Sequence, residues 1–243
     1  MNNKKWVGAL MALVLAVPAA MASPGKVVSA TNAEALRSDG TQRLKSGDTV
    51  QVGDQLVTGN RGQLSWVMDD GASHALAGNA SLTLDQFSKP ASNGGGGGRL
   101  LLSLTRGAFR AISGLIGKVG TDEYRVETPV ATMGIRGTTY AAAWCQDDCY
   151  DLSAGASRPM PNGLYVLVED GLVEIRSGGG TLLVKAGQRA YVPAASEPPR
   201  LVKVEPRVFL ELEQIMFDRL RLFEGSLPEL RFEIDVEVPA SPS

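Results

Sequence analysis

The sequence predicts an all-β protein built as a β-solenoid or roll of short strands, with a β-sandwich as the alternative. Strand-like segments recur about eight to twelve residues apart, and turn residues separate them. Apolar and polar residues alternate within these segments, so one face of each strand points inward. No long stretch of helical periodicity occurs before residue 205.

Glycine-containing dipeptides punctuate the first half of the chain. Gly59-Asn60, Asp70-Gly71 and Arg106-Gly107 each follow a strand-like segment and predict a turn, because glycine and asparagine tolerate positive φ. The run from Asn93 to Gly98 predicts a loop, since so many glycines cannot offset their ordering entropy by burial. The expected strands cover 26–30, 49–52, 55–58, 63–68, 73–76, 81–84, 99–105 and 108–112.

The second half continues the same pattern. Asp170-Gly171 lies between two alternating segments and is the best hairpin signal in the chain. Ala186-Gly187 separates a further pair of segments, and 113–120 is expected to be a flexible connector. The expected strands cover 123–127, 130–135, 137–144, 163–169, 172–176, 181–185 and 188–192.

The C-terminal part changes character. Residues 193–205 are expected to form a linker, and 206–243 a helix, a strand and a polar tail. Pro206 is suited to the first turn of the helix and Gly225 to its end. Leu230 to Val238 alternate as in a half-buried or edge strand. The helix could pack on the β body, or it could dock on another protein through its apolar residues, which are Phe209, Leu212, Ile215, Met216 and Leu220.

The first 22 residues have the layout of a secretory signal peptide. Lys4 and Lys5 precede an apolar run over 6–17, and Ala20-Met21-Ala22 is a cleavage pattern. The alternative, an uncleaved anchor, is disfavoured because the run is shorter than the ~20 residues that span a bilayer. The mature chain is therefore expected in the periplasm or secreted, without a transmembrane span.

Composition argues against several classes of function. The formal net charge is −2, and lysine and arginine are scattered, so there is no electrostatic surface for nucleic acid. His74 is the single histidine and lies outside any catalytic motif. Asp69-Asp70 before Gly71 is explained by turn chemistry. No enzyme activity, cofactor or metal site is expected.

The two cysteines, Cys145 and Cys149, leave three interpretations open. In an exported protein an even pair favours a structural disulfide. A metal site with Asp147 and Asp148 is the second interpretation. A redox-active pair is disfavoured, because the spacing is not that of a Cys-x-x-Cys motif.

The most distinctive segment runs from Glu127 to Tyr140. Pro129 suits a strand start, and Gly134 and Gly137 permit a bulge or a close backbone approach around Arg136. Arg136 could bury its guanidinium against backbone carbonyls, or it could face outward and bind a carboxylate of a partner. The residues of this pattern are Thr128, Pro129, Gly134, Arg136, Gly137, Thr138 and Tyr140.

This pattern resembles the signature of the FecR domain. The flanks agree with the family: Gly53-Asp54-x-Leu56-x-Thr58-Gly59 is similar to its opening strands, and Leu104-Thr105-Arg106-Gly107-Ala108-Phe109 to its central segment. Val168-Glu169-Asp170-Gly171-x-Val173 and Ala186-Gly187-Gln188 match its closing hairpins. The resemblance covers residues 26–192.

The resemblance implies a non-catalytic interaction or signalling module that binds another envelope protein, such as a transporter or membrane sensor. The best-known members are transmembrane regulators of iron-uptake transcription. This sequence departs from them, and we expect only the extracytoplasmic module. A cell-wall or carbohydrate-binding protein is the alternative, which would use exposed aromatic residues, with Trp66, Trp144, Tyr150 and Tyr165 as candidates.

Overall fold

The structure is a computed structural model, which describes residues 24–89, 97–152 and 158–224, with side chains up to Met216. The predicted signal peptide, most of the glycine run, the predicted strand over 230–238 and the polar tail lie outside the described residues. Within them, no helix is long and apolar enough to cross a bilayer.

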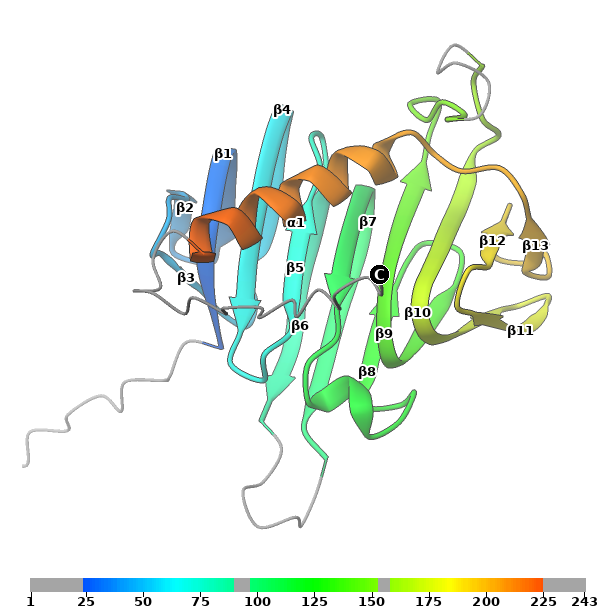
Figure 1. Cartoon of the computed structure of the whole chain (residues 1–243), viewed down its shortest axis with the longest axis horizontal. Coiled ribbons are helices and arrows are strands. Elements are labelled where there is room, and N and C mark those ends of the chain that lie inside the picture. The colour runs from blue at the N-terminus through cyan, green and yellow to red at the C-terminus, as the bar shows by residue number, and fades with distance from the viewer. Residues whose placement is uncertain (1–23, 90–96, 153–157, 225–243) are drawn as a thin grey trace, which may run out of the picture.

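The described chain forms one sheet of thirteen strands with a C-terminal helix, which confirms the all-β class (Figure 1). The choice between a solenoid and a sandwich stays a prediction. Pairing is antiparallel except between β7 and β8. The elements are β1 Gly25–Arg37, β2 Gly40–Arg43, β3 Thr49–Val50, β4 Gln55–Met68, β5 Ser73–Leu76, β6 Ser81–Ser88, β7 Arg99–Ile112, the short 3-10 helix η1 Ile116–Lys118, β8 Tyr124–Glu127, β9 Thr132–Cys145, β10 Gly163–Ser177, β11 Gly180–Lys185, β12 Arg189–Val192, β13 Arg200–Val202 and α1 Val208–Glu224.

Several strands are much longer than the sequence predicted. β4, β7, β9 and β10 each have 14 or 15 residues, and each joins two segments that the sequence predicted as separate strands. The predicted turns at Gly59-Asn60 and Arg106-Gly107 and the predicted hairpin at Asp170-Gly171 are therefore wrong. A type I′ turn needs positive φ at both central residues, whereas Gly171 has φ 83° and Asp170 is not in the left-handed region.

These glycines instead form β-bulges that reverse which face of the strand points inward. In β7, Leu100, Leu102 and Leu104 are buried in the main core, but after Gly107 the core residues are Phe109 and Ala111. One extra residue shifts the alternation and bends the strand. Because both halves of each long strand contribute to a single core, the sheet wraps around that core.

The bends form two rows. The β1–β7 bend contains the left-handed residues Asn32, Arg61, Asn79 and Gly107, and the β9–β12 bend contains Gly137, Gly171 and Gly187. The two rows lie at opposite ends of the shared strands. In the β7–β9 pairing Gly107 lies opposite Trp144, whereas Ile112 at the other end of β7 lies opposite Thr139, close to Gly137.

Each long strand changes a partner at its bend. β4 pairs with β6 before the bend and with β5 after it, and β10 pairs with β12 and then with β11. β7 pairs with β8 in its first half and with β9 in its second half. The bulges therefore divide the sheet into two connected parts that enclose the core.

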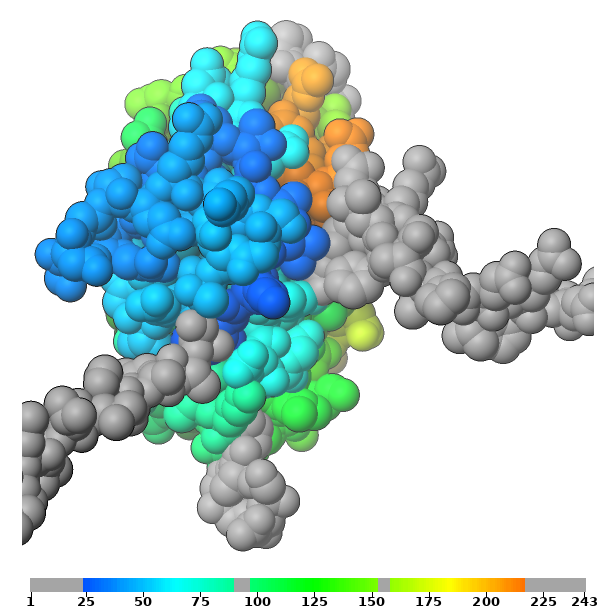
Figure 2. All heavy atoms as spheres, turned by 90° about the vertical axis from the view of Figure 1, so that its left-hand side faces the viewer, coloured from blue at the N-terminus to red at the C-terminus, as the bar shows by residue number. Residues whose placement is uncertain are grey.

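Helix α1 lies across strands β9, β7, β5 and β4 on the outer side of the sheet (Figures 1 and 2). Its buried residues are Phe209, Leu212, Ile215 and Met216, which pack in a second apolar cluster. The strand surface beneath is made of small side chains, which lets the helix approach closely: Ala75, Ala108, Ala141 and Ala143. These four helix residues therefore pack on the β body, and the side chain of Leu220 lies outside the described part.

Two segments are more ordered than predicted. The expected linker over 193–205 contains the edge strand β13, which pairs with β12. The expected flexible connector over 113–120 contains η1, and Ile116 is fully buried there. Asp70 holds this segment, since its Oδ2 atom accepts a hydrogen bond from the Ile116 amide at 3.2 Å. The interpretation of Asp70 as a turn residue is confirmed, because Oδ1 also accepts from the Ala72 amide.

The bulge at Gly171 predicts a graded response to alanine substitution. A Cβ atom at position 171 would lie 2.1 Å from the Gly137 carbonyl oxygen, whereas one at Gly187 would have no atom within 4 Å. Both glycines have positive φ, so both pay the left-handed cost of about 1 kcal/mol. We expect Gly171→Ala to lower the free energy of unfolding in urea by more than about 3 kcal/mol. Equal losses for Gly171→Ala and Gly187→Ala would contradict the contact.

Candidate functional site

The distinctive segment begins with a tight turn between β8 and β9. The Thr128 amide donates to the Ala131 carbonyl at 3.0 Å, and the Thr128 hydroxyl donates to the same oxygen at 2.8 Å. That hydroxyl also accepts a hydrogen bond from the Ala131 amide at 3.1 Å. Pro129 lies exposed within this turn, where no sheet donor is required. The first part of the pattern therefore has a structural role.

Gly134 allows the loop after η1 to approach β9. A Cβ atom at position 134 would lie 2.6 Å from the Thr121 carbonyl oxygen and 2.8 Å from the Thr121 Cβ atom. Any larger residue would push the loop away from the strand. The predicted close backbone approach is present at this glycine.

Thr138 joins the two bulges of the β9–β12 bend. Its hydroxyl lies 2.9 Å from the Arg136 carbonyl and 2.8 Å from the Leu172 carbonyl, and accepts from the Leu172 amide at 3.2 Å. The Thr138 amide donates to the Ser113 hydroxyl at 2.8 Å. The buried side chain of Thr138 thus satisfies backbone groups that the bulges remove from the regular ladder.

Tyr140 belongs to a buried chain of polar groups. Its hydroxyl donates to the Tyr124 hydroxyl at 2.9 Å, and the Tyr124 hydroxyl lies 3.0 Å from His74 Nε2. Trp66 stacks on the His74 ring with centroids 4.9 Å apart. Burial raises the pKa of both tyrosine hydroxyls above their usual range, so the phenols stay neutral. His74 is a core residue of the fold.

Arg136 is the exception within the pattern, because its side chain is exposed. No hydrogen bond or ion pair joins its guanidinium to another residue in the described part of the chain. The alternative in which Arg136 is buried against carbonyls is therefore wrong. The bulge at Gly137 holds the backbone at this position, so the arginine projects from a fixed point of the β9–β12 bend.

Exposed apolar side chains lie at the same end of the body. Ile112, Leu115 and Val119 are 43%, 57% and 53% exposed, although they flank the ordered helix η1. Ser113 connects this segment to the arginine, since the Ser113 amide donates to the Thr138 carbonyl at 3.0 Å. We call Arg136, Ile112, Leu115 and Val119 the Arg136 surface.

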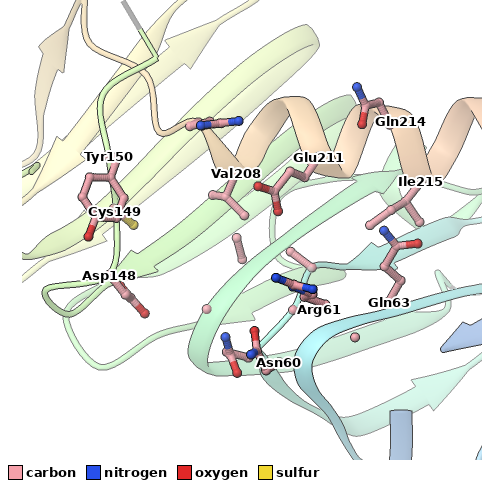
Figure 3. A pocket seen from close by; sticks show the side chains of 17 residues that line it. Asn60, Arg61, Gln63, Asp148, Cys149, Tyr150, Val208, Glu211, Gln214 and Ile215 are labelled. Carbon is pink, nitrogen blue, oxygen red and sulfur yellow. The ribbon is translucent and has the colours of Figure 1, made fainter. Parts of the chain in front are cut away.

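A groove of about 480 Å³ lies at the opposite end, between α1, the β1–β7 bend and the cysteine loop (Figure 3). The sequence did not predict this groove, because its lining residues come from segments that lie far apart along the chain. The lining residues are Asn60, Arg61, Gly62, Gln63, Ala77, Gly78, Asn79, Gly107, Ala108, Asp148, Cys149, Tyr150, Arg207, Val208, Glu211, Gln214 and Ile215.

A disulfide between Cys145 and Cys149 confirms the structural interpretation of the two cysteines. It fixes the loop that forms one wall of the groove. Asp148 Oδ1 accepts a hydrogen bond from the Gln146 amide at 2.8 Å, and the Asp147 amide donates to Asn162 Oδ1 at 2.7 Å. Both aspartates therefore shape the loop.

The aromatic residues considered for carbohydrate binding do not form a shared surface. Trp66 and Tyr165 are buried in the core, where Tyr165 stacks on Tyr191 with centroids 4.6 Å apart. Trp144 is half-buried, and Tyr150 alone of the four is exposed, at the edge of the groove.

The described residues offer no assembled catalytic or metal centre. No cluster of three or more histidine, cysteine, aspartate or glutamate residues is present among them. The groove contains Asp148 and Glu211, but Cys149 is held in the disulfide and His74 is in the core. The arrangement suits binding through hydrogen bonds and apolar contacts.

Comparison with known proteins identifies the family. Residues 54–174 match the family described as FecR protein, so the chain carries a FecR domain and belongs to that family over these residues. A comparison with curated proteins found no match.

Two crystal structures of a protein described as a candidate anti-sigma factor from Parabacteroides distasonis are similar to the chain. The sequence identity is 13% in both, and the TM-scores are 0.45 and 0.46. Each match covers 66% of this chain and 64% of the other chain. The chain thus spans a little under two thirds of the length of these structures.

The buried tyrosine pair predicts a pH-dependent stability. In the unfolded chain tyrosine ionises near pH 10, whereas the fold raises both pKa values, so the free energy of unfolding falls as pH rises above about 10. Tyr140→Phe should cost about 1 kcal/mol at neutral pH through the lost hydrogen bond. It should also flatten the alkaline decline, measured by urea unfolding at several pH values. An alkaline decline as steep in Tyr140→Phe as in the original chain would contradict the role of the buried pair.

Proposed function

We propose that this protein is an exported, non-catalytic signalling module of the FecR type, which binds another envelope protein through the Arg136 surface. The observation that carries the proposal is the exposure of Arg136. The surrounding residues Thr128, Gly134, Thr138 and Tyr140 all serve the fold, whereas the Arg136 guanidinium makes no hydrogen bond or ion pair with the described residues.

The composition of the Arg136 surface supports a protein partner. Arginine is enriched in protein interfaces and at their energetic hot spots, where apolar neighbours exclude water. Ile112, Leu115 and Val119 provide exposed apolar area at the same end of the body. The partner should present a carboxylate, which arginine binds in a bidentate manner.

Export is the second part of the proposal. The layout of residues 1–22 predicts cleavage after Ala22. The Cys145–Cys149 disulfide supports an oxidising compartment, since such bonds persist in the periplasm and outside the cell. A partner anchored in the envelope, such as a transporter or membrane sensor, is the class that this location favours.

Export has a direct test in the producing cell. Intact-mass analysis of the protein recovered from the periplasmic fraction should give a chain that begins at Ser23. Substituting Ala22 by a large residue should leave the leader attached. Recovery of the full-length chain from the cytoplasm alone would contradict export.

Site-directed crosslinking tests the interaction. A photo-reactive amino acid at Leu115 should yield one discrete protein adduct in intact cells, whereas the same group at Val52, an equally exposed apolar site, should not. Arg136→Glu should remove the Leu115 adduct, because the charge of the proposed contact is reversed. Arg43→Glu, at another exposed arginine, is the matched control.

The outcomes distinguish a protein partner bound through Arg136 from the cell-wall alternative. If the Leu115 adduct still forms in the Arg136→Glu variant, Arg136 is not part of the interface. An adduct with glycan instead of protein would overturn the proposed partner class and favour the cell-wall alternative.

A further inference from the structure

The groove between α1 and the β1–β7 bend is built from elements that hold their positions firmly. α1 is anchored beside it by the buried residues Phe209, Leu212 and Ile215. The opposite wall is closed by the Cys145–Cys149 disulfide, and the floor belongs to the bends of β4 and β7. A site of this construction is preformed, so binding does not have to order its walls.

Carboxamide side chains are concentrated around the groove. Gln63 comes from β4, and Asn60 and Asn79 come from the β1–β7 bend, whereas Gln214 projects from the opposite side of α1, away from Asn60 and Gln63 (Figure 3). The side chains of Gln63, Asn60 and Asn79 make no hydrogen bond to another side chain or backbone group among the described residues of the groove. Each carboxamide offers both donors and an acceptor, which is the same combination that a peptide unit presents.

The charges of the lining are balanced. Arg61 and Arg207 are matched by Asp148 and Glu211, and the groove therefore has no excess of either sign. Such a surface gives no preference for phosphate, nucleic acid or a cationic ligand, all of which require a charge excess. An uncharged ligand fits it best.

The floor of the groove is made of small residues. Gly62, Ala77, Gly78, Gly107 and Ala108 leave room for a ligand backbone to approach the sheet. Val208 and Ile215 on α1 add apolar contact above this floor. An extended peptide ligand with small apolar side chains would contact both the carboxamides and the apolar side chains of α1.

From these observations we propose that the groove binds an uncharged, extended peptide segment of a partner protein, with its main-chain amides paired to Gln63, Asn60 and Asn79. This site is independent of the Arg136 surface, since the two lie at opposite ends of the strands. A glycan is the less suitable ligand, because Tyr150 is the one aromatic ring in the lining and cannot sandwich successive sugars.

The test uses a display library of linear peptides selected on the purified mature protein with its disulfide intact. The selected peptide is synthesised, and its dissociation constant is measured by calorimetry. We expect Gln63→Ala and Asn60→Ala each to weaken binding about fivefold, the effect of one lost hydrogen bond. Gln51→Ala, at an exposed glutamine outside the groove, should not change the affinity.

The contrary results are equally specific. No enriched peptide, or peptides that bind Gln63→Ala and Asn60→Ala as tightly as the original chain, would overturn the proposal. A soluble peptidoglycan glycan strand that binds and is weakened by these two substitutions would replace the peptide by a sugar. Thermal unfolding of each variant checks that a lost affinity does not come from a lost fold. Arg136→Glu should leave peptide affinity intact, so failure of the peptide site is distinguishable from failure of the Arg136 surface.

Discussion

The fold depends on residues that adopt the left-handed backbone conformation in the middle of long strands. Each bulge inserts a residue, so the side chains that face the core change from one parity to the other, and the strand bends around that core. The bulges of β9 and β10 are in such close contact that there is no room for a Cβ atom on Gly171 beside the Gly137 carbonyl. The backbone groups displaced there need new partners, and the Thr138 hydroxyl provides them.

This constraint explains most of the distinctive pattern as architecture. Thr128 closes a turn, Gly134 admits a loop, Thr138 satisfies two bulges and Tyr140 joins a buried polar chain. The structural roles of these four residues are sufficient to explain why these residue types occur there. The residue that breaks this agreement is informative, since natural proteins depart from local consistency chiefly at functional sites. Within this segment that residue is Arg136, which is held rigidly and left in solvent.

Sequence patterns predicted the all-β class, the disulfide, the apolar residues of α1 and the family, but they left open whether these helix residues pack on the β body or on another protein. They did not distinguish a turn from a bulge, because Asp-Gly is compatible with both, and the decision rests on the φ of Asp170 and on the partners of β10. The apolar positions shift from the even-numbered Leu100, Leu102 and Leu104 to the odd-numbered Phe109 and Ala111, and this shift is visible in the sequence. Two separate strands would give the same shift, so the sequence does not distinguish them from one bulged strand. The His74, Tyr124 and Tyr140 contact depends on the register of three distant strands, which no local pattern contains.

The position of α1 gives the two ends of the body different properties. The helix covers the small residues of β5, β7 and β9 and reaches the β1–β7 bend, where the gap beside it becomes a groove. No described element covers the β9–β12 bend in the same way, and the apolar side chains around η1 stay in solvent there. Because the same hydrogen-bonded strands connect both ends, their separation is set by the sheet. Two ligands bound at these ends would therefore be held at a fixed distance, and communication between them would have to arise from that geometry and not from movement of the core.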